Sequence, residues 1–220
     1  MKIILLKIDD NVLWDDVKKY KYLLTEARVK KCERYIGDKN KVMSMFTELL
    51  IRKEAVKGQE LCLEYNEYGK PYLGKNSLDN QINEIAKYFS VSHSNQYIAY
   101  VESSEEIGID IEYMKPIKQN IVDRFFTENE CMSIRNSNNQ LEEIYRVWTR
   151  KEAYLKKIGT GFNKDSFKID IINKSKEEHM ISEKIDKYML SVCSSMPIEK
   201  IEKIVYNKDE ICKFYEEIYI

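Results

Sequence analysis

Residues 107–112 alternate strictly between isoleucine and other residue types, and this alternation constrains the fold more than any other feature of the chain. Side chains of a β-strand point to opposite faces in turn, so the pattern predicts a half-buried strand with one apolar and one acidic face. Asp110 and Glu112 then share a face, with Cα atoms about 6.6 Å apart at a rise of ~3.3 Å per residue. Two carboxylates so close, with no neighbouring cysteine or histidine, suit a hard cation such as Mg²⁺ or Mn²⁺. The alternative is a solvated strand face, because an Asp-x-Glu pair is common.

Residues 141–158 predict a long helix that Gly159 and Gly161 close. Its apolar positions are Ile144, Val147, Trp148 and Leu155. Lys151 lies about 100° round the helix from Glu152, since an α-helix has 3.6 residues per turn. The helix therefore has an apolar side for packing and a charged side.

Trp148, Glu152 and Lys156 fall in one row of this helix, because residues four apart lie above one another. Taken alone, Glu152 and Lys156 predict a surface ion pair worth about 0.2–0.5 kcal/mol. Together with Asp110 and Glu112, they form a set of three carboxylates and a lysine that can bind magnesium and a diphosphate.

Shorter patterns predict the remaining elements. The expected helices are residues 17–35, with Thr25 as a cap within them, 40–56 and 121–126, and the expected strands are residues 1–8, 88–92, 97–102, 167–172, 188–193 and 203–206. Residues 93–96 are expected to form a hairpin loop and residues 135–140 an exposed loop. The similar helix-then-strand content of residues 1–104 and 105–220 favours an α+β protein of two halves.

The charge and cysteine content exclude several classes of protein. The 36 basic and 37 acidic side chains give a net charge of −1, which does not favour a nucleic acid or an anionic membrane as partner. Residues 1–60, with 14 basic and 10 acidic side chains, hint at anion binding in the first half. The five cysteines form no Cys-x-x-Cys pair, and the two histidines cannot complete a zinc site. No segment approaches the ~18 apolar residues of a spanning helix, so we expect a soluble cytoplasmic protein.

The two motifs resemble the paired signature of the 4′-phosphopantetheinyl transferases. They read Gly108-Ile109-Asp110-Ile111-Glu112 and, about 40 residues later, Trp148-x-x-Lys151-Glu152-Ala153-x-x-Lys156. The length of the chain, Tyr68-Gly69-Lys70-Pro71 and Ser92-His93-Ser94 are similar to the large monomeric class that activates peptide and polyketide synthetases. The resemblance covers about residues 2–193. It implies two similar α+β halves, related by a pseudo-twofold, with the active-site cleft between them.

The resemblance implies a Mg²⁺-dependent reaction, with Mn²⁺ as a possible substitute. The 4′-phosphopantetheine group of coenzyme A passes to a serine of an apo acyl or peptidyl carrier protein, and adenosine 3′,5′-bisphosphate is released. Asp110, Glu112 and Glu152 are the implied metal ligands, and Glu152 is also the expected acceptor of the serine proton. Lys156, helped by Lys151, is expected to stabilise or protonate the departing bisphosphate.

The resemblance assigns coenzyme A binding to the first half, residues 1–104. Arg28, Lys31 and Ser44 match the positions that bind the 3′-phosphate. The alternative for the cations is a solvated basic helix face. The chain departs from similar proteins at Met43, where a basic residue is common. The resemblance then implies either weaker binding of the 3′-phosphate or a contact from Lys41 in its place.

The turn at Lys70 and the Ser92-His93-Ser94 segment also match coenzyme A positions of the family. Lys70 is expected at the nucleotide end, and Ser92 and His93 at the diphosphate, where His93 donates to an oxygen. The alternatives are ordinary turn chemistry for Lys70 and a solvated histidine for His93.

The second half, residues 105–220, is expected to hold the metal and to dock the carrier protein. The apolar contacts expected for the carrier are Ile117, Ile121, Phe125 and Phe126, with Lys115, Lys118 and Arg124 at the rim. A core position is the alternative for Phe125 or Phe126, because only one face of their helix can be exposed.

Two rival functions use the same residues. A magnesium-dependent nuclease also combines paired carboxylates with a Glu-x-x-x-Lys helix, although this chain has no long basic stripe. A non-catalytic protein that binds coenzyme A or a carrier would not need the complete set of Asp110, Glu112, Glu152 and Lys156.

Overall fold

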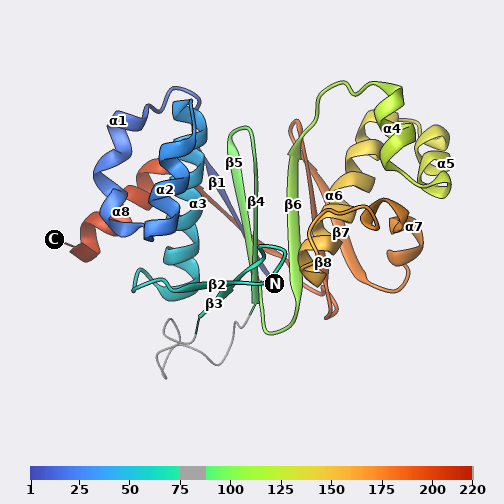
Figure 1. Ribbon diagram of the computed structural model, residues 1–220. Helices are drawn as coiled ribbons and strands as arrows, with labels where there is room; N and C mark the ends of the chain where they lie inside the picture. The colour runs from blue at the N-terminus through green and yellow to red at the C-terminus, as the bar shows by residue number, and fades with distance from the viewer. Residues whose placement is uncertain (75–87, 220) are drawn as a thin grey trace.

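The computed structural model describes residues 1–74 and 88–219 and has a mixed α+β fold (Figure 1). The helices are α1 (Trp14–Val17), η1 (Lys18–Leu23), α2 (Glu26–Arg34), α3 (Asp38–Val56), α4 (Gln119–Phe125), α5 (Glu128–Asn136), α6 (Gln140–Ile158), η3 (Ser166–Lys168), α7 (Ile171–Lys174) and α8 (Lys208–Tyr219). The strands are β1 (Lys2–Lys7), β2 (Leu63–Tyr65), β3 (Pro71–Leu73), β4 (Tyr88–Ser94), β5 (Tyr97–Ser103), β6 (Ile107–Tyr113), β7 (His179–Ile185), β8 (Tyr188–Ser194) and β9 (Glu202–Asn207). No described helix is both long enough and apolar enough to cross a lipid bilayer.

Four strands in the order β4-β5-β1-β9 form the first sheet, and both of its faces are covered. Ile4 and Leu6 of β1 pack into a core with helix α3, whereas Ile3 and Leu5 pack toward the second sheet. Alternate residues of a strand point to opposite faces, so a strand covered on both sides is a continuous apolar run. This is why β1 resembles an uninterrupted hydrophobic segment in the sequence.

Three strands in the order β6-β8-β7 form the second sheet, against which α6 packs. Ile107, Ile109 and Ile111 of β6 are fully buried in the core between the two sheets. The predicted strand and its apolar face are confirmed. Its acidic face, however, is also covered, because α6 lies over it and leaves Asp110 only 3% exposed. The expectation of a half-buried strand is therefore wrong on that side.

Gly108 allows α6 to lie directly on β6. A Cβ atom at this position would come within 1.9 Å of the Ala153 carbonyl oxygen and 2.6 Å of the Lys157 amide nitrogen. Both are backbone atoms, so no side-chain movement could relieve the clash. The absence of a side chain at Gly108 therefore sets the short distance between β6 and the part of α6 that carries Glu152 and Lys156.

Strands β4 and β6 are edge strands of the two sheets and lie side by side (Figure 1). Serine side chains of β4 bridge them, since Ser90 Oγ accepts a hydrogen bond from the Ile109 amide at 3.1 Å. Ser94 Oγ accepts another from the Tyr113 amide at 3.0 Å. The partner numbers rise together, so the two strands run in the same direction. Serine hydroxyl groups of β4 thus join the two halves by hydrogen bonds to β6.

The loop predicted for residues 93–96 is shorter than expected. His93 and Ser94 continue β4, and the turn consists of Asn95 and Gln96. Asn95 has φ = 51°, a left-handed conformation that asparagine tolerates better than most residues.

Other predictions fail in the second half. Residues 167–172, expected as a strand, lie in η3 and α7, and the first part of the expected loop 135–140 belongs to α5. The sequence patterns predicted neither α5 nor β7. Helices 40–56, 121–126 and 141–158 and strands 188–193 and 203–206 are confirmed to within a few residues.

The last two elements return to the first half. Strand β9 pairs in parallel with β1, and Tyr215 of α8 donates a 2.7 Å hydrogen bond to the Leu49 carbonyl of α3. The predicted division at 104/105 placed these residues with the second half. In space, residues 202–219 complete the sheet and core of the first.

Candidate active site

Three carboxylates lie within electrostatic reach of one another where α6 crosses β6. Partial burial raises the pKa of Glu152 to about 7, the charges of Asp110 and Glu112 add to the shift, and Lys156 opposes it. Burial also raises the pKa of Glu112, and the neighbouring charge of Asp110 adds to that effect. The structure thus brings together the three acids and the lysine that the sequence singled out. Clustered carboxylates that resist ionisation are typical of sites that bind a cation or move a proton.

Asp110 is held at one oxygen and free at the other. Its Oδ1 accepts 2.7 Å hydrogen bonds from Lys156 Nζ and from Ser92 Oγ. Its Oδ2 is buried and has no hydrogen-bond partner among the described residues. An unpaired buried carboxylate oxygen is costly, so it marks a place where a further positive group fits.

The donors fit Mg²⁺, although they do not form a finished site. Within the described parts of the chain, no three Asp, Glu, His or Cys side chains are grouped closely enough to hold a metal ion by themselves. Mg²⁺ usually takes only one or two carboxylates and fills its octahedron with water and phosphate oxygens. The free Asp110 Oδ2 and the adjacent Glu112 and Glu152 suit that arrangement.

A cationic pocket lies across the junction from the acids. It is lined by Ala27, Arg28, Lys31, Thr47, Tyr65, Gly69, Pro71, Val91 and His93. Burial lowers the pKa of His93, and the charges of Lys156, Lys31 and Arg28 lower it further. His93 therefore lies within electrostatic reach of cations from both halves.

Ser44 is buried behind this pocket and is reached by Arg28, whose Nη1 lies 3.4 Å from Ser44 Oγ. Arg28 also donates from Nε to the buried Glu48 carboxylate at 2.9 Å. Met43, the departure from the family, packs in the core of the first half. Its side chain is 5% exposed and does not line the cationic pocket. Because Arg28 is already paired with Glu48, we expect Lys31 to be the cation of α2 that contacts a ligand in this pocket.

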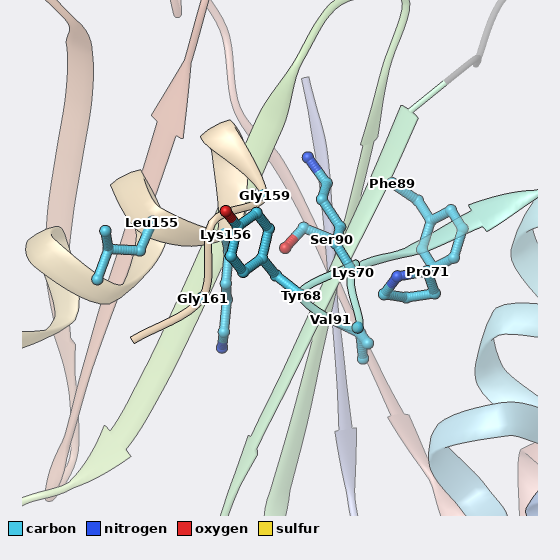
Figure 2. A pocket seen from close by; sticks show the side chains of 11 residues that line it. Tyr68, Lys70, Pro71, Phe89, Ser90, Val91, Leu155, Lys156, Gly159 and Gly161 are labelled. Carbon is cyan, nitrogen blue, oxygen red and sulfur yellow. The ribbon is translucent and has the colours of Figure 1, made fainter. Parts of the chain in front are cut away.

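Lys70 does not point into the cationic pocket. Its Nζ donates to the Lys157 carbonyl at 2.6 Å, and Asn66 Nδ2 donates to the Gly159 carbonyl at 2.7 Å. The turn before β3 thereby caps the C-terminal end of α6, where carbonyl groups lack helical partners. Lys70 lines a second pocket at this junction, between Leu155 on the α6 side and Phe89 on the β4 side (Figure 2).

Lys151 is also separated from the acids. It is fully buried and lies 2.7 Å from the carboxylate of Glu130, which is likewise 0% exposed. Glu130 also accepts hydrogen bonds from the Thr127 and Ile171 amides, so one ion pair joins α5, α6 and the start of α7. The interpretation of Lys151 as a phosphate ligand is replaced by a structural one. Sequence reasoning missed Glu130, because α5 was not predicted.

An apolar pocket adjoins Glu112. Its lining consists of Glu112, Ile117, Ile121, Phe125, Phe126, Ile144, Tyr145 and Trp148. Phe126 is buried in the core of the second half, whereas Ile121 is 42% exposed. The core alternative is therefore confirmed for Phe126, while Phe125 is only partly buried and packs against that core.

Comparison with known proteins places this geometry in a family. Residues 106–199, which carry the three acids and Lys156, match the model of the 4′-phosphopantetheinyl transferase superfamily. Over these residues the chain is similar to this superfamily. It is 33% identical over 135 residues to the 4′-phosphopantetheinyl transferase gsp of Aneurinibacillus migulanus, in an alignment that covers 58% of this chain and 53% of that protein.

Other 4′-phosphopantetheinyl transferases align over more of the chain. A 4′-phosphopantetheinyl transferase of Bacillus subtilis is 29% identical over 76% of this chain and 80% of its own length. The 4′-phosphopantetheinyl transferase Sfp of Bacillus subtilis strain 168 is 26% identical over 77% of this chain and 76% of its own. These relatives support the resemblance to the Sfp class and the assignment of the chain to this class of enzymes.

Proposed function

We propose that this protein transfers 4′-phosphopantetheine from coenzyme A to a serine of an apo carrier protein, with Mg²⁺, and releases adenosine 3′,5′-bisphosphate. The observation that carries the proposal is the convergence of Asp110, Glu112, Glu152 and Lys156 beside the cationic pocket of His93. The acids suit a metal-bound diphosphate, and the cations suit the remaining phosphate of the cosubstrate.

The first half would bind coenzyme A. Lys31 and Arg28 would supply positive charge for the 3′-phosphate. His93 shares their pocket and lies within electrostatic reach of Lys156, so it would contact the diphosphate. Tyr65 offers an aromatic surface in the same pocket. In this proposal residues 1–104 hold the nucleotide, while residues from 105 onward hold the metal and the carrier.

The reaction would be an in-line displacement at phosphorus. The serine oxygen attacks the phosphorus next to the pantetheine, and the bond to the bridging oxygen breaks. Glu152 accepts the serine proton, a role suited to a carboxyl whose pKa is about 7. Lys156 lies at the same cluster and can donate a proton or a hydrogen bond to the departing bisphosphate. Asp110, Glu112 and Glu152 would hold Mg²⁺, which would neutralise charge on the diphosphate.

The carrier would dock at the apolar pocket beside Glu112. Ile121 and Phe125 of α4 offer apolar contacts, and the carrier serine would then lie near Glu152. Helix-in-groove recognition of this kind uses a few apolar anchors with a polar rim. One chain supplies both sides of the site, which supports a monomer, and we retain the expectation of a cytoplasmic enzyme of secondary metabolism.

Mass spectrometry of a carrier tests the proposal directly. The protein is incubated with an apo peptidyl or acyl carrier domain, coenzyme A and Mg²⁺, and the carrier should gain the mass of phosphopantetheine. Omission of Mg²⁺ with chelator should abolish the gain. Cleavage of plasmid DNA without any mass gain would favour the nuclease, and coenzyme A binding without transfer would favour a non-catalytic protein.

A further inference from the structure

We propose that Ser92 and Ser94 of β4 are positioning residues for the two carboxylates of β6, so that the first half of the chain organises the metal site of the second. This inference rests on the proposed function, because it concerns the metal that the reaction uses. It differs from the expectation that Ser92 contacts coenzyme A.

The register of the two edge strands creates the pairing. Both strands repeat their side-chain direction every two residues, so serines two apart on β4 meet carboxylates two apart on β6. Ser92 Oγ lies 2.7 Å from Asp110 Oδ1, and Ser94 Oγ lies 2.7 Å from Glu112 Oε2. Ser90 occupies the preceding position of the same row, and its Oγ accepts a hydrogen bond from the Ile109 amide. Among the described residues, Ser90 forms no hydrogen bond with a carboxylate.

The direction of these hydrogen bonds follows from chemistry. An ionised carboxylate can only accept, so each serine must donate its hydroxyl proton to it. Ser94 shows this clearly, because its oxygen already accepts from the Tyr113 amide and its proton remains for Glu112. The two serines therefore act as fixed donors aimed at the acids.

Each hydrogen bond fixes one carboxylate oxygen and leaves the other for a different partner. In Asp110, Ser92 and Lys156 both hold Oδ1, and the buried Oδ2 is the atom without a partner among the described residues. Ser92 is itself buried, at 8% exposed, so it cannot turn to solvent. If Ser92 lost its hydroxyl, Asp110 Oδ1 would keep the hydrogen bond from Lys156. The carboxylate could then rotate toward the lysine and away from a bound cation.

Mn²⁺ binding by Ser92→Ala tests the inference, and Ser90→Ala is the matched control. Free Mn²⁺ is measured by electron paramagnetic resonance in the full chain without carrier or coenzyme A. Loss of an outer-shell hydrogen bond typically weakens metal affinity about 10–100-fold, and we expect this for Ser92→Ala. Ser90→Ala should lose a similar strand bridge but keep its Mn²⁺ affinity within about twofold of the wild type. Ser92→Thr keeps the hydroxyl and should restore most of the affinity.

A kinetic readout separates positioning from a general loss of structure. In the transfer assay, Ser92→Ala should raise the KM for Mg²⁺ about 10-fold or more, while saturating Mg²⁺ restores most of kcat. If the alanine variant does not fold, Ser92→Cys fills the same space with a weaker donor and should show the same raised KM.

Three results would overturn the inference: unchanged Mn²⁺ affinity in Ser92→Ala, equal losses in Ser92→Ala and Ser90→Ala, or wild-type Mn²⁺ binding that Asp110→Asn does not weaken. The proposed function is decided separately, by the carrier mass gain of the wild-type protein. An active transferase with unchanged Mn²⁺ affinity in Ser92→Ala would refute the role of the serines alone.

Discussion

Lys156 of α6 and Asp110 of β6 form a 2.7 Å ion pair across the surface where Gly108 lets the helix rest on the strand. Lys156 is partly exposed, at 29%, whereas the Asp110 side chain is nearly buried, at 4%. The pair therefore joins a solvent-facing cation to an interior acid, and its geometry depends on how closely α6 approaches β6.

Gly108→Ala should disrupt both the fold and the site. The new Cβ would overlap the Ala153 carbonyl oxygen, so α6 must move away from β6. Overpacking of this kind typically costs about 1–3 kcal/mol or more, and we expect a lower urea midpoint together with strongly reduced transfer. Gly37→Ala is the control, because no atom lies within 4 Å of a Cβ there. Normal activity in Gly108→Ala would show that the close approach is not needed.

Glu152→Gln should reduce turnover with little effect on coenzyme A binding. The amide cannot accept the serine proton and is a poorer metal ligand, so kcat should fall about 100-fold or more. The KM for coenzyme A should stay within a few-fold, since the proposed phosphate contacts lie in the cationic pocket. The control is Glu142→Gln on the same helix, where Glu142 pairs with Lys184 at the surface. Equal losses in kcat and in coenzyme A affinity would contradict this division of roles.

The stability of the protein without divalent metal should depend on the ionisation of Glu152. Its pKa of about 7 in the folded state exceeds the ordinary glutamate value of 4.5, so between these pH values the folded state holds the extra proton. This contribution is present below about pH 4.5 and is lost as the pH rises through 7, which makes ionised Glu152 destabilising by up to ~3 kcal/mol.

Thermal unfolding in chelator tests this linkage. Glu152→Gln should melt at a higher temperature than the wild type at pH 8, and the difference should shrink toward pH 5. Glu142→Gln supplies the control for removing a glutamate from α6 and should show no such trend. A difference between Glu152→Gln and wild type that is constant from pH 5 to pH 8 would disprove the shifted ionisation.

Lys31→Ala should weaken binding of coenzyme A through its 3′-phosphate. We expect a KM about 10-fold higher, equivalent to ~1.4 kcal/mol, and little change with dephospho-coenzyme A. Lys31 is a cleaner probe than Arg28, because removing Arg28 would leave the buried Glu48 without its ion-pair partner. Lys30→Ala is the control, since Lys30 is exposed and pairs with Glu26. An identical loss with both cosubstrates would argue against a 3′-phosphate contact.

Ile121→Asp should impair the carrier reaction alone. Ile121 is 42% exposed beside the apolar pocket, so a charge there should oppose docking without unfolding the protein. The KM for the carrier should rise about 10-fold, whereas coenzyme A binding, measured by calorimetry, should not change. Val205→Asp on the exposed side of β9 is the matched control. Unchanged carrier kinetics in Ile121→Asp would place the docking surface elsewhere.

The sequence predicted the long periodic elements and the acids on them. The alternation in β6 and the row Trp148, Glu152 and Lys156 are local patterns, and each depends on one element only. The role of Lys151 could not be predicted in this way. Its side chain is buried against Glu130 of α5, and the sequence patterns did not predict α5.

Long-range partners explain the other differences. Ser94 and its neighbours are polar and resemble loop residues, yet hydrogen bonds to β6 keep them in a strand. Lys70 belongs to a turn whose partner, the end of α6, lies 87 residues further along the chain. Such contacts join segments that no local window contains. The register of β4 against β6 could therefore not be predicted, although the repeat of Ser90, Ser92 and Ser94 is visible.

The parallel pairing of β1 with β9 has a consequence for biosynthesis. Lys2 pairs with Glu202, so β1, which also pairs with β5, acquires its second neighbour only after synthesis of a strand that begins 200 residues further along. Contacts this distant in sequence slow folding, and an uncovered strand edge invites association with other chains. During translation the nascent chain that exposes this edge of β1 should therefore need chaperone protection, and deletions within residues 202–219 should reduce the yield of correctly folded protein more than they reduce its specific activity.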